Sequence, residues 1–132
     1  MAVKINFIDN GRGIEFLALK ITAGEEIIEI NKQLYNRDVF SKVRYIIIDR
    51  TNASKYNVSS DDIKSIAKQL IDAAKINPNM LIAIVSKTPL QYGMSRMLEA
   101  YAEESEFEIQ IFDKRKNADN WIGKMLECYM EK

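Results

Sequence analysis

Two stretches near the start of the chain alternate apolar and polar side chains. The first is Val3–Ile8, the second begins at Ile14, and the polar sequence DNGRG lies between them. Alternation with a period of two is typical of strands with one buried face, and a short glycine-containing loop often joins two antiparallel strands. The pattern therefore predicts a β-hairpin, in which Gly11 or Gly13 supplies the positive φ that the turn requires.

Three further stretches predict strands of the same sheet. YIIID (45–49) and MLIAIV (80–85) have no polar face, which is typical of interior strands that are covered on both sides. FEIQIFD (107–113) returns to alternation, with Glu108 and Gln110 opposite the apolar side chains, and predicts an edge strand or a partly hydrated face. We therefore expect the hairpin and the last strand to flank the two apolar strands.

Four segments between and after these strands predict helices. In the first, Thr22 is expected to cap the helix, and Glu25, three residues later, to reach back to the cap. The second starts at Ser59 or Ser60, is followed by two aspartates whose charges favour a first turn, and stops near Asn77. Both segments thus begin with residues that suit a helix amino end.

The third helix has the clearest start. Thr88 is a capping residue, Pro89 fits the first helical position, and Gln91 follows three residues after the cap. The stripe that we expect to be buried on this helix consists of Leu90, Met94, Met97 and Tyr101. The fourth helix is expected to begin near Asn117. Its apolar side comprises Ala118, Trp121, Ile122, Met125 and Tyr129.

The order of the elements is strand, strand, helix, and then three pairs of strand and helix. Because strands that are separated by helices pair in parallel, this order predicts an α/β protein with four helices and a five-stranded mixed sheet, formed by the hairpin and three parallel strands. The 132 residues, 47% of them hydrophobic, suffice for a single domain over 1–132 with its own core. The patterns do not determine the strand order.

The charge balance and the apolar runs restrict the possible partners. Lys plus Arg and Asp plus Glu both number 19, so no net charge draws the chain to nucleic acid or to an anionic membrane. The longest apolar run, 80–85, is too short to be a membrane segment, and the first residues become polar too early for a secretory signal. We therefore expect a cytoplasmic protein.

The sequence lacks the residues and motifs that several classes of catalytic and binding site require. The chain contains no histidine, and no GxSxG motif exposes a nucleophilic serine. Its glycines form no phosphate-binding loop, and two acidic pairs, at 25–26 and 61–62, lie in first turns of helices, where the helix dipole explains them. Cys128 is interpreted as a small packing residue. We therefore expect a protein that is not an enzyme and that holds no cofactor or metal.

The loops at the carboxyl edge of the sheet are the first candidate for a binding site. In a parallel sheet the strand-to-helix loops emerge at this edge, beside helix amino ends that favour anions. The cations in these loops are Arg50, Lys55, Lys87, Lys114, Arg115 and Lys116. These charges are either simply solvated, or some of them bind a small anion. Arg50 and Lys87 are the candidate ligand-binding residues among them.

The segment YGMSRM (92–97) is the second candidate. Gly93 lies inside the first turns of a helix, where glycine costs about 1 kcal/mol relative to alanine, and close approach of another backbone is one reason for it. Tyr92 and Arg96 share a helix face and could contact a ligand, with Ser95 between them in the sequence. Alternatively, Tyr92 and Arg96 stack on each other, or Arg96 pairs with Glu99 or Glu103 on its own helix.

Several of these segments together resemble a known family. YIIID with its polar loop, VSSDDIKSIA, MLIAIVSKTPLQYGMSRMLEAYAE, FEIQIFD and the closing helix from Ala118 to Trp121 are similar to the SpoIIAA-like (STAS/SEC14-related) family of small bacterial proteins. YGMSRM and the closing Ala-x-x-Trp are the more specific marks. The resemblance implies a β-α fold related to anti-sigma-factor antagonists and, more distantly, to lipid-carrying Sec14 folds.

The resemblance also implies a modification site. In anti-sigma-factor antagonists a serine at the amino end of the helix after the central strand is phosphorylated, which releases a protein partner. Ser59 and Ser60 occupy the similar place, but Asp61 and Asp62 follow them where the family pattern Asp-Ser-x-Gly has glycine. A phosphate would meet the helix dipole favourably and these carboxylates unfavourably, so helix capping is the alternative role.

Two functions follow from these observations. The first is a non-enzymatic regulatory or binding module that engages a protein partner or a second copy of itself as a homodimer. The alternative is a carrier of a small anionic or lipid-like ligand, held at the strand ends near Tyr92–Met97, where methionines adapt to an irregular pocket. An enzyme is a third possibility, which would need a cleft with a strongly shifted Lys, Tyr or carboxylate.

Overall fold

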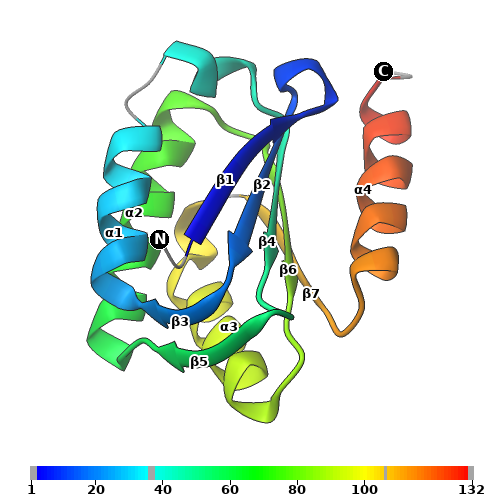
Figure 1. The fold of residues 1–132 in the computed structure, drawn as a ribbon. Helices are drawn as coiled ribbons and strands as arrows, with labels where there is room; N and C mark the ends of the chain where they lie inside the picture. Colours follow the sequence, from blue (N-terminus) through cyan, green and yellow to red (C-terminus); the bar gives the residue numbers. More distant parts are fainter. Residues whose placement is uncertain (1–2, 36–37, 106, 131–132) are drawn as a thin grey trace.

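A computed structural model describes residues 3–35, 38–105 and 107–130 (Figure 1). Its main sheet has the order β1, β2, β4, β6 and β7, with bounds Val3–Ile8, Gly13–Ala18, Tyr45–Asp49, Leu81–Val85 and Glu108–Phe112. β1 pairs antiparallel with β2, and the other neighbours pair in parallel. The predicted five-stranded mixed sheet is confirmed, with the hairpin and β7 on either side of the apolar strands β4 and β6.

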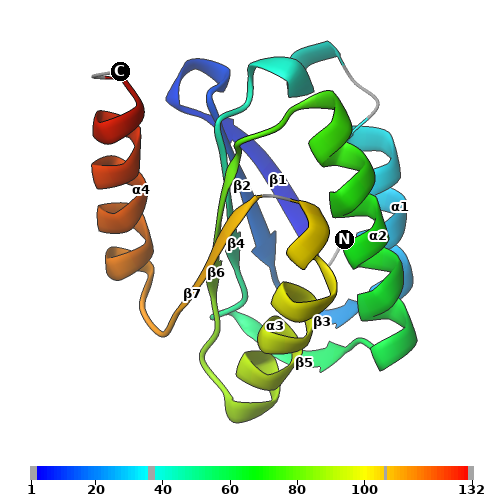
Figure 2. The ribbon, with the colours of Figure 1, turned by 180° about the vertical axis from the view of Figure 1, so that it is seen from behind.

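The described residues form four α-helices, α1 (Gly24–Leu34), α2 (Ser60–Ile76), α3 (Pro89–Tyr101) and α4 (Arg115–Met130). α1, α2 and α3 cover one face of the sheet, whereas α4 lies alone on the other face (Figures 1 and 2). All four begin at the carboxyl edge of the parallel strands, as expected. Short 3₁₀ helices occupy Asp9–Gly11 (η1), Asp38–Lys42 (η2) and Glu103–Ser105 (η3). None of the helices described is long and apolar enough to cross a membrane.

A second sheet of two strands lies at the carboxyl edge and was not predicted. β3 (Lys20–Ala23) pairs in parallel with β5 (Ala53–Asn57). These strands occupy the connections that lead from β2 to α1 and from β4 to α2. Their sequences, KITA and ASKYN, are too short to show a clear period. Lys55 consequently lies in a strand and not in the loop where it was expected.

Thr22 does not cap α1, contrary to the prediction. The N-cap residue is Ala23, which makes no side-chain capping hydrogen bond. Thr22 belongs to β3 and is fully buried, and its Oγ1 donates to the carbonyl oxygen of Leu19 at 3.4 Å. Because β3 keeps the backbone extended through Ala23, the helix starts one residue later than a Thr22 cap would place it.

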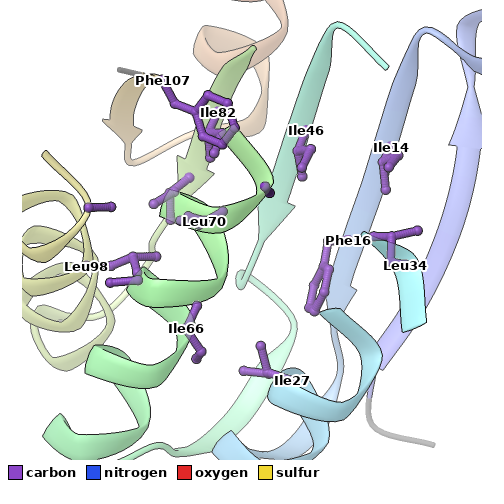
Figure 3. Packing of buried hydrophobic residues seen from close by; sticks show 14 of the residues in the cluster. Ile14, Phe16, Ile27, Leu34, Ile46, Ile66, Leu70, Ile82, Leu98 and Phe107 are labelled. Carbon is purple, nitrogen blue, oxygen red and sulfur yellow. The ribbon is translucent and has the colours of Figure 1, made fainter. Parts of the chain in front are cut away.

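The larger core lies between the sheet and the helices α1, α2 and α3 (Figure 3). Alternate strand residues point into it, including Ile14 and Phe16 from β2, Ile46 from β4 and Ile82 from β6. They pack against Ile27, Leu34, Ile66, Leu70 and Leu98 from the three helices. Removal of this apolar surface from water is the main force that holds the two layers together.

A smaller core lies on the opposite face, under α4. Its strand residues are Tyr45, Ile47, Leu81, Ala83 and Val85. Ala118 and Ile122 of α4 are buried against them, and Trp121 and Met125 are partly buried. The predicted apolar side of α4 is confirmed for these four residues, whereas the side chain of Tyr129 lies outside the part that the structure describes.

The two hairpin glycines have different roles. Gly11 has φ +87°, a conformation that other residues rarely adopt. Gly13 pairs with Tyr45 in the register of β2 and β4, and a Cβ at this position would overlap the tyrosine ring. Gly11 therefore supplies a positive φ, while Gly13 makes room for the ring of Tyr45.

The apolar stripe that was predicted to be buried on α3 is partly exposed. We call Leu90, Met94, Met97 and Tyr101 the α3 stripe. Leu90 is 57% exposed and Tyr101 42%, and the two methionines are only partly buried. The buried residues of α3 are instead Gln91, Ser95 and Leu98, centred about 100° farther round the helix. The prediction was wrong because hydrogen bonds to distant residues satisfy the two polar side chains in the interior.

Candidate functional site

A buried polar network joins the ends of β4 and β6 to α3. Arg50 follows β4 and is 3% exposed, and its Nη1 donates to Ser95 Oγ at 2.7 Å. The hydroxyl of Ser95 lies 2.7 Å from that of Ser86, which follows β6, and donates to the carbonyl oxygen of Gln91 at 2.9 Å. Gln91 Nε2 donates to the carbonyl oxygen of Arg50 at 2.9 Å. The structure thus brings Arg50 and Ser95 together, but inside the protein.

The amino end of α3 has the predicted cap. Thr88 Oγ1 accepts from the Gln91 amide at 3.1 Å, and Gln91 Oε1 accepts from the amides of Lys87 at 2.7 Å and Thr88 at 3.3 Å. Gln91 therefore uses its oxygen for the cap and its nitrogen for Arg50. These bonds occupy amides that an anion would otherwise bind at a helix start.

The other three ligand candidates lie on the outer surface. Lys87, Tyr92 and Arg96 are exposed. Arg96 Nη1 forms an ion pair with Glu99 Oε1 at 3.1 Å, which is the alternative that the sequence left open. The candidates therefore divide into a buried pair, Arg50 and Ser95, and three exposed side chains, and they do not line one pocket.

A partly enclosed cavity lies between the sheet and the helices α1, α2 and α3. Its lining is mostly apolar, and Asn31 and Arg50 contribute polar groups. The cavity has room for about 20 Å³, which corresponds to about one water molecule. It is therefore too small for a lipid-like ligand.

Two wider grooves open on the surface. One of about 880 Å³ runs between β1 and α1, and one of about 420 Å³ lies between the hairpin and α4. None of the predicted ligand candidates belongs to the lining of either groove. The larger groove therefore lies apart from the cations that were expected at the carboxyl edge, whereas Arg115, one of those cations, lines the smaller groove.

Ser59 is the N-cap of α2, and Ser60 is the first residue of the helix. Ser59 Oγ accepts from the Asp62 amide at 3.1 Å, and Asp62 Oδ2 accepts from the Ser59 amide at 3.0 Å. This reciprocal pair is a capping box, which satisfies two amides of the helix start. The hydroxyl of Ser59 is thus engaged in the fold, whereas Ser60 is exposed.

We expect Ser59→Ala to lower the free energy of unfolding by about 1 kcal/mol, because the Asp62 amide loses its acceptor. Urea unfolding followed by circular dichroism would measure the change. Ser60→Ala is the matched control and should change the same quantity by less than about 0.5 kcal/mol. Equal effects of the two substitutions would contradict the capping role.

Arg115 begins α4 and binds three carboxylates, although it was expected in a loop of the anion-binding edge. Its Nη2 lies 2.7 Å from Glu15 Oε2, its Nη1 3.2 Å from Asp49 Oδ2 and its Nε 3.0 Å from Asp119 Oδ1. The other oxygen of Asp49 accepts from the amide and hydroxyl of Thr51. Arg115 thus ties α4 to β2 and β4, and its guanidinium is already engaged. The sequence signal was weak, since Glu15 is a single polar residue between apolar ones.

The acid stability of the protein should depend on Glu15. Its pKa is lowered because Asn6 Nδ2, and then Arg115, donate to its carboxylate. A carboxyl with a depressed folded pKa stabilises the fold above its unfolded pKa, here 4.5, and this contribution is lost as the pH falls through the folded pKa. In urea unfolding at a series of pH values, the wild type should lose more stability on acidification than Glu15→Gln. Parallel curves would contradict this.

The exposed apolar surface is concentrated on α3. Among the described residues, six large apolar side chains are exposed, and Leu90, Tyr92 and Tyr101 belong to this helix. The other three, Phe7, Ile21 and Ile76, come from three different elements. No other single element in the described part of the chain presents more than one such side chain.

Gly93 has no steric reason within the described chain, because a Cβ there would meet nothing within 4 Å. We therefore expect Gly93→Ala to raise the free energy of unfolding by about 1 kcal/mol through the higher helix propensity of alanine. Thermal or urea unfolding would measure the gain. Gly13→Ala adds the same methyl group against the ring of Tyr45 and should destabilise the protein instead. A loss of stability in Gly93→Ala would show that the helix start is strained at this position.

The acidic residues and the single cysteine form no recognisable chemical site in the described part of the chain. Within the described residues, no three His, Cys, Asp or Glu side chains gather so that they could hold a metal ion. Cys128 is exposed on α4, so its interpretation as a packing residue was wrong. Cys128 and the preceding Glu127 are exposed, whereas Met125 and Leu126 before them are partly buried against the sheet.

Comparison with known proteins identifies the class of fold. No protein-family model and no curated protein matches the sequence. A solved structure that is similar belongs to an uncharacterized protein from the DUF3478 family, with a SpoIIAA-like fold, from Shewanella loihica PV-4. The two chains are 16% identical, the alignment covers 91% of each, and the TM-score is 0.56. The fold of this protein is therefore SpoIIAA-like, as the sequence resemblance implied.

Proposed function

We propose that this protein is a non-enzymatic binding module that engages a protein partner through the outer surface of α3. The exposure of Leu90 and Tyr101 on one side of this helix, and of Tyr92 on the opposite side, carries the proposal. Large apolar and aromatic side chains that gather on a surface are typical of sites of protein association. The likeness to anti-sigma-factor antagonists supports a regulatory role, and the sequence supports a cytoplasmic setting.

A protein partner suits this surface better than a small ligand does. Arg50 and Ser95, two of the candidate ligand residues, are bonded to each other in the interior. Arg96 is paired with Glu99, and the cavity that Arg50 lines has room for about 20 Å³. A carrier would need α3 to move off the sheet, which would break the hydrogen bonds that join Gln91 and Ser95 to Arg50.

Site-specific photocrosslinking in the source cell tests the proposal. A photoreactive p-benzoylphenylalanine at position 90 replaces an exposed leucine of α3, and the same group at Lys124 on the exposed side of α4 is the control. We expect a discrete protein adduct from position 90 and none from position 124. Equal labelling from both positions, or none from either, would overturn the proposal.

A further inference from the structure

The α3 stripe has the spacing of a helix-packing surface. Leu90, Met94, Met97 and Tyr101 follow one another at intervals of four, three and four residues. This repeat keeps the side chains on one side of a helix, as in pairs of helices that pack nearly antiparallel. Leu90 and Tyr101 at the ends of the stripe are exposed, and Met94 and Met97 between them pack against the main core while staying partly open to solvent.

We infer that the partner of the α3 stripe is a second copy of this chain, bound in a two-fold symmetric contact in which the two α3 helices run antiparallel. The inference rests on the proposed function and names its partner. In a two-fold contact the same surface serves both copies, so it must be complementary to itself.

The stripe is complementary to itself in the antiparallel direction. If the two-fold axis passes between Met94 and Met97, Met94 of one copy faces Met97 of the other. Leu90 of each copy then faces Tyr101 of the second copy, so that the most exposed residue of the stripe packs against an aromatic ring. Small residues, Gly93 and Ala100, lie along one side of the stripe and leave room for a neighbouring helix.

The charges at the two ends of α3 favour the same arrangement. Lys87 is exposed just before the helix, and Glu104 is exposed just after it. Neither forms an ion pair within the described residues. Antiparallel pairing puts Lys87 of each copy beside Glu104 of the other, whereas parallel pairing would put like charges together. Lys64 also lies near this end, with its Nζ 5.7 Å from the Tyr101 ring. Because Glu103 and Glu104 are two acids against this one lysine, the net charge of this end is negative.

These opposite charges are what single out a second copy among protein partners. An unrelated protein has no reason to require a cation at one end of the stripe and an anion at the other, while a two-fold contact requires both on the same chain. The contact is small, because a helix of 13 residues is about 20 Å long. We therefore expect a weak dimer whose population rises with concentration.

Sedimentation velocity over a concentration series tests the inference through charge reversal. Lys87→Glu and Glu104→Lys should each raise the dissociation constant by about tenfold, because each reversal acts at both ends of the symmetric contact. The double variant Lys87→Glu/Glu104→Lys should restore the wild-type constant. Lys116→Glu, an exposed reversal on α4, is the matched control and should leave it unchanged.

The outcomes separate this inference from the proposed function. A wild type that stays monomeric at up to about 1 mM overturns the second copy as partner, as does a dimer that the double reversal fails to restore. If position 90 nevertheless crosslinks to a different protein, the proposed function stands and only the inference fails. Leu90→Ser removes an exposed side chain without touching the core and should abolish the dimer; an unchanged dimer in this variant also overturns the contact.

Discussion

Asn77→Leu is expected to lower the free energy of unfolding by about 3 kcal/mol, because each of two buried carbonyl groups loses its side-chain donor. Asn77 follows α2 and is 4% exposed. Its Nδ2 donates to the carbonyl oxygens of Phe40 and Val43, both at 2.7 Å, and so fastens the segment before β4 to the end of α2. Leucine has a similar size but cannot donate.

Urea unfolding followed by circular dichroism measures this loss. Gln33→Leu is the matched control, since it replaces an exposed amide of α1 by the same residue and should change stability by about 0.5 kcal/mol or less. If the urea midpoint and the m-value were the same in both variants, the two hydrogen bonds from Asn77 to carbonyl groups would make no net contribution to the free energy of unfolding. A loss of stability in Asn77→Leu but not in Gln33→Leu would assign the loss to those two hydrogen bonds.

Arg115→Met is expected to cost about 2 kcal/mol and to loosen α4 in particular. The substitution keeps an apolar stem but leaves Glu15, Asp49 and Asp119 close together without their shared cation. The side chain of Arg115 is 31% exposed, so the effect should lie between that of a surface pair and that of a fully buried one.

The single tryptophan reports on this change directly. Trp121 lies on α4 with its ring centroid 5.7 Å from that of Phe112 in β7. Its fluorescence in Arg115→Met should shift toward that of a hydrated indole, and amide hydrogen exchange should accelerate in α4 more than in α2. Lys116→Met changes the adjacent exposed residue and should leave both signals as in the wild type. Uniform acceleration in both helices would contradict a local role for Arg115.

Much of the fold could be predicted from the sequence, because hydrophobic periodicity reports which side of an element is buried. The runs at 45–49 and 80–85 are the two central strands, and Thr88 with Pro89 marks the start of α3 correctly. β3 and β5 could not be predicted in this way. They are short, and their pairing is irregular, with a register shift between Lys20 and Ile21. Their sequences therefore show no regular alternation of apolar and polar residues.

The candidate site was less predictable, because its contacts join residues that are distant in the chain. Arg50 and Ser95 are 45 residues apart, and Glu15 and Arg115 are 100 apart. Such contacts depend on the strand order, which the hydrophobic pattern does not contain. The same limitation explains the error on α3: the helix has an apolar side and a polar side, and only the position of Arg50 makes the polar side the buried one.

The solitary position of α4 affects how the protein is made. Ile47, Leu81 and Val85 on that face of the sheet have their cover only from a helix that follows every strand in the sequence. Until α4 docks on the sheet, a folding chain therefore presents a bare apolar face to chaperones and to other unfinished chains.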